Sequence, residues 1–571
     1  MLVRDFVVRF AGEGGQGVVT SAEALAQTST TAGYHALTFA TFPSQIMGGP
    51  TWTQVRISVE PVLSPGDDVD VLVAFNLEAY HAHLGDVRDG GVVIFNSNEF
   101  QLEPDPRVLG LPIDDLARST GNNRAANMIV VGALAYLVNM SKDFLERFVV
   151  QRFTRGRSTD AEIIKSNILA ISHGWEHISQ IGFALGELAT PQMPDGPQLM
   201  LKGNEAVALG ALAGGLEFFA GYPISPATAI LVYLERGLVG PGKFVYQVSS
   251  EIESITAVLG GGFAGKKSMT ATSGPGISLM SEGLGLAWMA EIPCVVVDVQ
   301  RAGPATGLPT KTEQSDLMAC MFPAHGDVRL PIIAPGSVEE CFHGAVAALN
   351  WAERYQGPVI LMSEMTLAER VQNIPKPDLS KIEVTNRRVF QGANSYHRYA
   401  GLELSPMPIP GSPGAYVANG SEHDDMGDTT HLAERHVQMT ERRFSKLKLL
   451  ETDTYERDRP EEPIALLPWG GSKGPVQEAY VKLKEQGVPV SWYYTMFLNP
   501  LPPRLLKELR QKELVIVPEL NYQGQFASIL RSQGVRAEAI TQYTGLPFKV
   551  RDLVQQITDM ASAPRREMAR A

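Results

Sequence analysis

The sequence predicts an α/β protein built of three α/β domains and one extended connector. Its 571 residues are enough for about three or four domains. In three stretches, at residues 1–190, 196–375 and 461–565, short apolar runs typical of buried strands alternate with helical periodicity. Residues 376–460 are instead rich in Pro, Gly, Asp, His and Arg and show little periodicity, which indicates a long connector between domains.

Composition and charge exclude several classes of protein. The net charge is −13 and no long basic run is present, which argues against a nucleic-acid partner. The longest apolar stretch, near residues 125–138, is shorter than the roughly 20 residues that span a bilayer. Charges at Arg4, Asp5 and Arg9 interrupt any apolar region of a signal peptide. We therefore expect a cytoplasmic protein with no membrane partner.

Cysteine usage limits the redox chemistry of the chain. Its three cysteines, Cys294, Cys320 and Cys341, form no CxxC pair. An iron–sulfur cluster needs about four thiolates, so this chain cannot hold one by itself. A disulfide framework is equally disfavoured. We expect three buried, apolar thiols.

The strands and helices of the first stretch follow from its apolar runs. Strands are expected at residues 5–11, 71–75 and 91–95, and a buried helix is expected at residues 128–140. This alternation favours a parallel sheet with helices on both faces. The polar, proline-bearing residues 190–198 indicate a linker.

The other two stretches show the same alternation. In the second stretch, strands are expected at residues 218–220, 268–271, 293–299 and 359–362. In the last stretch, strands are expected at residues 464–467, 489–494 and 513–518, with an amphipathic helix at residues 476–486. Both patterns predict further α/β layers.

A glycine-rich loop, GEGGQG at residues 12–17, follows the first predicted strand and precedes a helix. Backbone amides of such a loop can hold an anion at a helix N-terminus. Two interpretations remain open: a tight turn without a ligand, or a site for a phosphate-bearing ligand such as coenzyme A. The candidate residues for coenzyme A are Gly14, Gly15, Gln16 and Gly17. An NAD site is disfavoured, because residues 32–42 offer no Asp or Glu for the ribose.

The densest motifs lie in the second stretch. Glu251 opens a helix of small residues, AVLGGGFAG at 257–265, and the next strand ends in TSGPG at 272–276. Small residues let a helix approach a sheet or a ring closely, and the glycines and proline shape a turn. This order resembles the pyrimidine-binding domain of thiamine-diphosphate enzymes.

Further motifs narrow the resemblance to the 2-oxoacid:ferredoxin oxidoreductases. In residues 1–190, GEGGQGVVT, MGGPT at 47–51, VRIS at 55–58 and an N…GAL pattern that begins at Asn127 resemble the gamma domain of that family. In this family the gamma domain lies over the active site and helps enclose coenzyme A. The resemblance implies a gamma domain (1–190), a thiamine pyrimidine-binding domain (196–375), the connector (376–460) and a transketolase C-terminal-like domain (461–565). PELNYQGQ at 518–525 matches an ExNxxGQ pattern of the last domain, which in thiamine enzymes is mostly structural.

The resemblance assigns Glu251 a catalytic role. In thiamine enzymes a carboxyl group hydrogen-bonded to the aminopyrimidine stabilises the imino tautomer, which then removes the thiazolium C2 proton. Glu253 lies two residues on and points elsewhere on a helix. The alternative for Glu251 is a solvated acid at a helix N-terminus. The residues expected to contact the cofactor are Pro223, Ile224, Thr272, Ser273 and Gly274.

Two motifs point to the substrate. YPISP at 222–226 resembles the family's YPITP, with a serine hydroxyl in place of that of threonine. RAGPATGLPTKTEQSDL at 301–317 resembles a stretch of the 2-oxoglutarate-type and broad-specificity members, with alanine in place of serine at position 305. Arg301 follows a strand at the edge where open α/β sheets bind ligands, and a guanidinium there suits a carboxylate. The residues expected to bind substrate are Tyr222, Ser225, Arg301, Thr310 and Lys311, the last two at a distal carboxylate.

A diphosphate-binding half with a GDG…N metal motif is missing from the sequence. The resemblance therefore implies a beta subunit that carries the other half of the thiamine diphosphate site, Mg²⁺ and a [4Fe-4S] cluster, in an (αβ)₂ heterotetramer that reduces ferredoxin. No metal site is predicted in this chain. GSEHDDMG at 420–427 is expected to form a folded loop, because His431 is too far from His423 for a compact ligand pair.

These inferences lead to one expected function. The chain should be the alpha subunit of a thiamine-diphosphate-dependent 2-oxoglutarate:ferredoxin oxidoreductase, active only with its beta subunit. It would convert a 2-oxoacid and coenzyme A to an acyl-CoA, or run the reverse reductive carboxylation. Pyruvate and branched-chain 2-oxoacids remain open as substrates. A non-oxidative lyase similar to acetohydroxyacid synthase and a catalytically silent assembly subunit also remain open.

Overall fold

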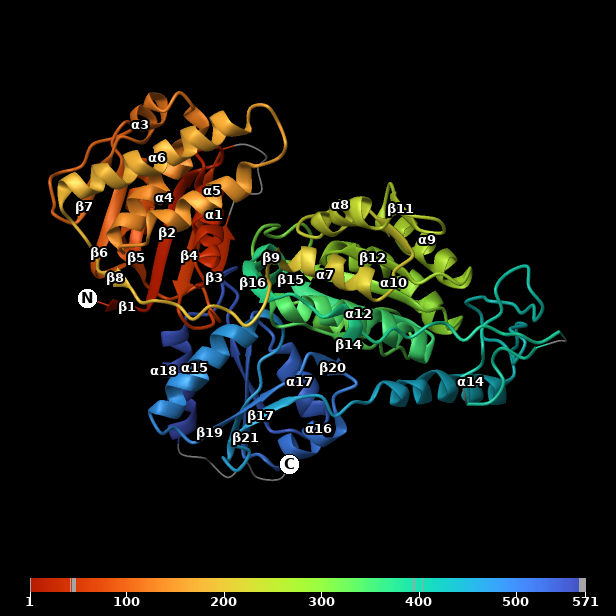
Figure 1. Ribbon diagram of the computed structural model, residues 1–571. Coiled ribbons are helices and arrows are strands. Elements are labelled where there is room, and N and C mark those ends of the chain that lie inside the picture. The colour runs from red at the N-terminus through yellow and green to blue at the C-terminus, as the bar shows by residue number, and fades with distance from the viewer. Residues whose placement is uncertain (1, 42, 44–47, 394–395, 403, 564–571) are drawn as a thin grey trace. The chain divides into compact units, whose positions relative to one another are not determined.

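The computed structural model describes residues 2–41, 43, 48–393, 396–402 and 404–563 (Figure 1). Met47 of the MGGPT motif lies outside these residues. The chain divides into two compact units: Met1–Leu201 with Arg370–Lys376, and Lys202–Glu369 with Pro377–Ala571. Residues 370–376 thus return to the first unit after the chain has left it. The domain boundaries inferred from the sequence stay predictions.

The first unit is built on an eight-stranded mixed sheet with strand order β7-β6-β5-β2-β4-β3-β16-β9. Its strands are β2 (Asp5–Glu13), β3 (His35–Thr41), β4 (Pro50–Ser58), β5 (Val69–Ala74), β6 (Val87–Asn96), β7 (Val108–Leu111), β9 (Gln198–Lys202) and β16 (Val371–Pro375). A separate small sheet pairs β1 (Leu2–Val3) with β8 (Glu187–Leu188). The three strands predicted in this unit are confirmed.

The prediction of a parallel sheet was wrong for part of the first unit. β2, β5, β6 and β7 are parallel, but β4 is antiparallel to both β2 and β3, and β16 is antiparallel to β3. Residues 42–49, between β3 and β4, are too few for the crossover of about a dozen residues that a parallel pair requires. These strands therefore turn back on one another.

Helices cover both faces of this sheet unequally. One face packs against α1 (Val18–Thr31), α3 (Ile113–Ser119), α4 (Ala126–Leu137), α5 (Lys142–Phe153) and α6 (Asp160–Ile181), and this layer holds the main core. The other face is covered by α2 (Leu77–His83) with Phe100 and Leu102. The predicted buried helix at residues 128–140 is confirmed as α4. α4 and α6 touch through their backbones: a Cβ on Gly132 would lie 2.1 Å from the carbonyl oxygen of Ile171.

The second unit contains two sheets. The seven-stranded sheet has the order β11-β10-β12-β13-β15-β14-β20 and is parallel except for β20. Its strands are β10 (Phe218–Gly221), β11 (Phe244–Gln247), β12 (Ser268–Thr272), β13 (Cys294–Gln300), β14 (Ile332–Ile333), β15 (Pro358–Glu364) and β20 (Phe497–Asn499). The five-stranded sheet has the order β17-β19-β18-β21-β22. Its strands are β17 (Glu456–Asp458), β18 (Ile464–Leu466), β19 (Val490–Tyr494), β21 (Leu514–Glu519) and β22 (Ala537–Thr541).

Helices alternate with these strands, and every strand predicted in this unit is confirmed. The first sheet is accompanied by α7 (Gly203–Ala213), α8 (Thr228–Gly237), α9 (Glu251–Phe263), α10 (Gly274–Met289), α11 (Leu317–Met321), α12 (Val338–Tyr355) and α13 (Met365–Glu369). The second sheet is accompanied by α15 (Lys473–Glu485), which confirms the predicted amphipathic helix, and by α16 (Pro503–Gln511), α17 (Gln525–Ser532) and α18 (Val550–Ser562).

The three cysteines lie on β13, α11 and α12, all buried and without a disulfide, as expected. No helix among the described residues is both long and apolar enough to cross a membrane.

The connector contains a helix that the sequence analysis did not predict, α14 (Ala433–Ser445) (Figure 1). A buried ionic cluster ties α14 and the neighbouring loops to the end of α10. Glu291, 1% exposed, receives two hydrogen bonds from the Arg442 guanidinium, at 2.8 and 3.1 Å, and an ion pair from Lys446 at 3.0 Å. Arg398 lies 3.6 Å from the same carboxylate. Burial alone would raise the pKa of Glu291, but Lys446, Arg442 and Arg398 more than offset this, and its pKa falls well below the usual value.

Glu291→Gln should loosen the connector strongly. The neutral amide would leave the buried guanidinium groups of Arg442 and Arg398 without their counter-charge, a change that costs about 3–5 kcal/mol in buried pairs of this kind. Hydrogen exchange of the α14 amides should accelerate accordingly. Glu434→Gln, at the exposed start of α14, is the matched control and should leave the exchange unchanged. Equal exchange in the Glu291 variant and the wild type would show that the cluster does not hold the connector.

Candidate active site

Three loops that carry the predicted motifs meet at one edge of the seven-stranded sheet. β10 runs into YPISP, β12 into TSGPG, and β13 into Arg301. β10, β12 and β13 are neighbours and parallel, so their carboxyl ends lie on the same side of the sheet. This edge is where open α/β sheets bind ligands.

Glu251 faces inward at this edge. It is the first residue of α9 and is 6% exposed, although a helix N-terminus usually leaves its acids in solvent. Its neighbour Glu253 is exposed and accepts hydrogen bonds from the backbone and hydroxyl of Ser249, at 2.7 and 2.6 Å. The two acids therefore have different environments, as the sequence predicts for a helix.

Gly276 allows α9, β12 and α10 to converge. A Cβ at this position would lie 1.9 Å from Thr272 Oγ1 and 2.8 Å from Glu251 Cγ. No real Cβ occupies such positions, so only glycine fits here without displacing Thr272 or Glu251. The TSGPG turn and the inward-facing acid are thus in direct contact.

Buried polar atoms without a hydrogen-bond partner among the described residues lie along β12 and the TSGPG turn, which meets Glu251 at Thr272 and Gly276. They include the hydroxyl oxygens of Thr270, Thr272 and Ser273. Buried hydroxyls are normally paired, and unpaired ones need an explanation. An acidic group next to hydroxyls that can donate and accept suits a polar heteroaromatic ring, and this donor set fits the aminopyrimidine of thiamine.

A second pair of acids lies behind the TSGPG turn. A Cβ at Gly274 would lie 2.7 Å from Asp316 Oδ2, and Asp298 accepts a hydrogen bond from Cys320 Sγ at 3.5 Å. Burial raises the pKa of Asp316 to about 6, with Glu313 adding to the rise and Arg301 opposing it. Burial and the charge of Asp316 raise the pKa of Asp298 well above its usual value. Both carboxyl groups are therefore harder to ionise than an exposed aspartate.

The predicted substrate residues fall into two groups. Arg301 is 7% exposed and donates from Nη1 to the backbone oxygen of Ser225 at 2.7 Å, so these two residues lie together. Pro223 and Ile224 are half-buried, and the exposed Tyr222 precedes them. Burial lowers the pKa of Arg301, while Asp316 opposes that change.

Thr310 and Lys311 belong to a loop closed at its base. Ala302 N donates to Lys311 O at 3.0 Å, and Leu308 N donates to Ala302 O at 2.9 Å. The Lys311 side chain packs against Gly545, where a Cβ would lie 2.8 Å from Lys311 Cβ. Burial lowers the pKa of Lys311. This loop is tied to residues far along the chain, a link that the sequence analysis missed.

The candidate coenzyme A residues of the first unit form an exposed turn. Gly14 N donates to Gly49 O at 3.3 Å, and Gln16 Oε1 accepts from Glu13 N at 2.7 Å and from Asn76 Nδ2 at 3.0 Å. Gly17 has φ 87° and directly precedes α1. The side-chain oxygen of Gln16 is thus used within the turn, while the backbone around Gly14 and Gly15 stays exposed.

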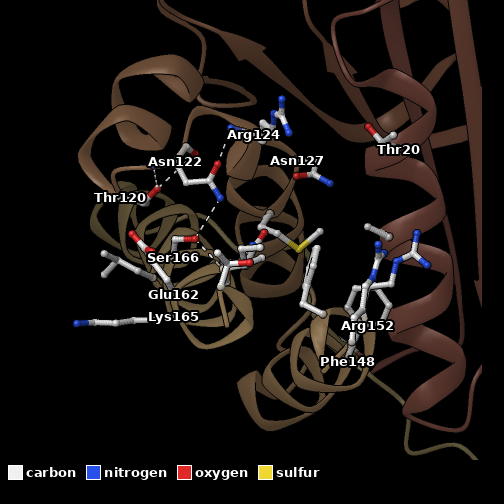
Figure 2. Close-up of a pocket in the computed structure, with 18 of the residues that line it drawn as sticks. Thr20, Thr120, Asn122, Arg124, Asn127, Phe148, Arg152, Glu162, Lys165 and Ser166 are labelled. Carbon is white, nitrogen blue, oxygen red and sulfur yellow. Dashed lines mark hydrogen bonds between the residues drawn. The ribbon is translucent and has the colours of Figure 1, made fainter. Parts of the chain in front are cut away.

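A cavity of about 860 Å³ lies between α1 and the helices α4, α5 and α6 of the same unit (Figure 2). Arg124 and Asn127 line it at the N-terminal end of α4, Arg152 lines it from α5, and Thr20 lines it from α1. Thr20 donates to Gly17 O at 3.0 Å, so the cavity begins one helical turn beyond the glycine loop. None of the four candidate coenzyme A residues lines it. The sequence analysis used Asn127 only as a motif residue and did not predict this cavity.

Two family models match the chain. The thiamine-diphosphate-binding model of pyruvate flavodoxin/ferredoxin oxidoreductases matches residues 209–442, and the pyruvate ferredoxin/flavodoxin oxidoreductase model matches residues 7–177. The 2-oxoglutarate oxidoreductase subunit KorA of Mycobacterium tuberculosis is 32% identical, over 96% of this chain and 90% of its own. The chain belongs to the 2-oxoacid:ferredoxin oxidoreductase family.

Other members of the family are similar to this chain over nearly its full length. The 2-oxoacid:ferredoxin oxidoreductase 2 alpha subunit of Aeropyrum pernix is 29% identical over 97% of this chain and 98% of its own. Among solved structures, a 2-oxoglutarate:ferredoxin oxidoreductase from Magnetococcus marinus has a TM-score of 0.92 and 36% identity, covering 98% of this chain and 100% of that one. That structure has 2-oxoglutarate, coenzyme A and succinyl-CoA bound.

Gly276→Ala should weaken thiamine diphosphate binding in this oxidoreductase, because the new methyl group would displace Thr272 or Glu251. We expect a loss of activity of about 10-fold or more at fixed cofactor, since small displacements of positioned groups are costly. Titration of thiamine diphosphate into the cofactor-depleted complex would measure the change. Gly260→Ala on α9, where a Cβ would meet nothing within 4 Å, is the control. Similar cofactor affinities in the two variants would contradict the assigned contact.

Asp316→Asn should change how stability depends on pH. A carboxyl group whose pKa is raised on folding contributes stability below its unfolded pKa, and this contribution is lost as the pH rises through about 6. The variant should therefore gain in denaturant midpoint relative to the wild type between pH 5 and pH 7.5. A relative change that is flat, or of the opposite sign, would show that Asp316 ionises without cost in the folded protein.

Proposed function

We propose that this chain is the alpha subunit of a 2-oxoglutarate:ferredoxin oxidoreductase, which converts 2-oxoglutarate and coenzyme A to succinyl-CoA and CO₂ or runs the reverse reaction. The observation that carries the proposal is the buried Glu251 in contact with the TSGPG turn, next to the unpaired hydroxyl of Thr272. The 36% identical Magnetococcus marinus enzyme, with its bound 2-oxoglutarate and succinyl-CoA, supports the substrate.

Glu251, Thr272 and Ser273 would hold the aminopyrimidine of thiamine diphosphate, with Pro223, Ile224 and Gly274 beside it. When bound, this cofactor supplies the nucleophilic carbon and the electron sink for decarboxylation. Glu251 would hold the proton exchanged with the pyrimidine ring, and its burial would keep competing water from that contact.

The substrate would bind at the same edge of the sheet. Arg301 can pair with the carboxylate next to the keto group, since a guanidinium binds a carboxylate through two parallel hydrogen bonds. Ser225, whose backbone oxygen accepts from Arg301, would offer its hydroxyl nearby, and the exposed Tyr222 would contact the substrate from the same motif. Thr310 and Lys311 would meet the distal carboxylate of 2-oxoglutarate, which pyruvate lacks.

The remaining parts come from other molecules. A beta subunit would supply the diphosphate half of the site with Mg²⁺ and a [4Fe-4S] cluster, and ferredoxin would accept the electrons. An (αβ)₂ heterotetramer in the cytoplasm is the proposed assembly. Coenzyme A would contact the first unit, with the backbone of Gly14, Gly15, Gln16 and Gly17 as its proposed phosphate contact.

Glu251→Gln should lower the turnover of the assembled complex by about 100-fold or more, the usual scale for a positioned proton-transfer group. The measurement is coenzyme A-dependent reduction of a viologen dye with 2-oxoglutarate or pyruvate. Glu253→Gln, two residues along on the exposed side, is the matched control and should retain activity. Full activity in the Glu251 variant would favour a silent assembly subunit. Turnover without coenzyme A would favour a non-oxidative lyase, and a preference for pyruvate would overturn the substrate.

A further inference from the structure

A buried glutamine joins two parts of the second unit. One is the substrate loop, residues 302–318, and the other is the C-terminal part, residues 456–562, which carries the five-stranded sheet. Gln314 is completely buried, and all four of its polar groups bond to that part. Its backbone N donates to Leu520 O at 2.7 Å, and its Oε1 accepts from Leu520 N at 3.0 Å. Its Nε2 donates to Trp469 O at 2.8 Å, and its backbone oxygen accepts from Asn521 Nδ2 at 3.0 Å. The position of Gln314 is therefore set by residues that follow it at a great distance in the sequence.

We call this set of hydrogen bonds between the substrate loop and the C-terminal part the seam. A second side-chain amide, that of Gln525, extends it. Gln525 Nε2 donates to Ser315 O at 2.7 Å, and its Oε1 accepts from Met318 N at 2.9 Å. At the other end, Thr312 N donates to Gly545 O at 3.3 Å. The backbone from residue 312 to residue 318 is thus fixed by hydrogen bonds to the C-terminal part.

The seam amides are themselves oriented. Glu519, completely buried, accepts from Asn521 Nδ2 at 2.9 Å and from the backbone amides of Phe526 and Ala527 at 2.8 and 2.9 Å. Asn521 Oδ1 accepts from Gly524 N at 2.7 Å. These bonds leave Asn521 one orientation, with its amide aimed at Gln314. The ExNxxGQ pattern accounts for each of these roles.

The fixed segment lies between the groups proposed to touch ligands. Lys311 directly precedes it and is linked to the residue after Arg301 through the bond from Ala302 N to Lys311 O. Asp316 lies within it, against Gly274 of the TSGPG turn. Apolar packing alone would be enough to hold two parts of the chain together. Side-chain amides bonded to specific backbone groups also fix the position of each residue of the loop relative to the C-terminal part.

We propose that Asn521 and Gln525 are positioning residues for the 2-oxoacid. They hold the loop so that Arg301 and Lys311 stay at the separation that the two carboxylates of a dicarboxylic substrate require. This inference rests on the proposed function and deepens it, because it gives the C-terminal part a share in substrate selection.

The test uses Asn521→Leu and Gln525→Leu in the complete complex with its beta subunit. We expect KM for 2-oxoglutarate to rise about 10-fold or more while kcat stays within about threefold, because a misplaced loop weakens substrate binding more than the chemistry. KM for pyruvate, which has no distal carboxylate, should change much less. Hydrogen exchange of residues 302–318 should accelerate in both variants, a readout that remains if one of them assembles poorly.

Ser491→Ala is the matched control. Ser491 is buried in the same part of the chain, and its hydroxyl donates to Ile464 O at 2.9 Å without reaching the substrate loop. This variant should lose thermal stability but keep the wild-type KM. If the seam variants behave like Ser491→Ala, with lower Tm and unchanged KM, the positioning role is overturned and the proposed function stands. A wild-type complex without 2-oxoacid-dependent dye reduction would overturn the proposed function, and the inference with it.

Discussion

The site depends on the parallel alignment of β10, β12 and β13. Because parallel neighbours end on the same side of a sheet, three motifs that are well separated in the sequence arrive at one edge. The close approach at Gly276 then brings the helix that begins at Glu251 against that edge. If one of these three strands ran in the opposite direction, its motif would lie at the other end of the sheet. That motif could then not share a ligand with the other two.

The second unit stabilises its loops by two different kinds of polar burial. At the Gln314 seam, neutral amides pair with backbone groups, which gives precise geometry at a small desolvation penalty. At Glu291, three cations surround one carboxylate, and burial in this cluster lowers the pKa of Lys446 to about 7, although Glu291 opposes the change. The hydrogen bonds of Gln314 fix the position of the substrate loop near the site. The Glu291 cluster instead anchors the connector, away from the site.

Local patterns in the sequence predicted much of this molecule, and long-range pairing explains most of what they missed. Apolar runs located the strands and α15, and family motifs named Ser225 and Arg301 as substrate residues, two residues that are hydrogen-bonded to each other in the structure. The parallel sheet of the first unit was mispredicted because strand direction depends on the length of the connection between β3 and β4. α14 has an amphipathic pattern of its own, which was overlooked among the Pro- and Gly-rich residues around it. The bonds from Arg442 to Glu291 and from Gln314 to Trp469, by contrast, are invisible to local periodicity.

The return of β16 to the sheet of the first unit has a topological consequence. β16 covers the free edge of β3, where Gln372 pairs with Leu37 and the Asn373 side chain accepts from Ala36 N at 3.1 Å. The first unit is therefore not a contiguous fragment, and cutting the chain after residue 201 would leave an unprotected strand edge, the kind of surface that recruits foreign strands. The polypeptide also passes between the two units three times, near residues 201, 369 and 376, so the units are joined by three covalent connections where two domains in simple succession have one.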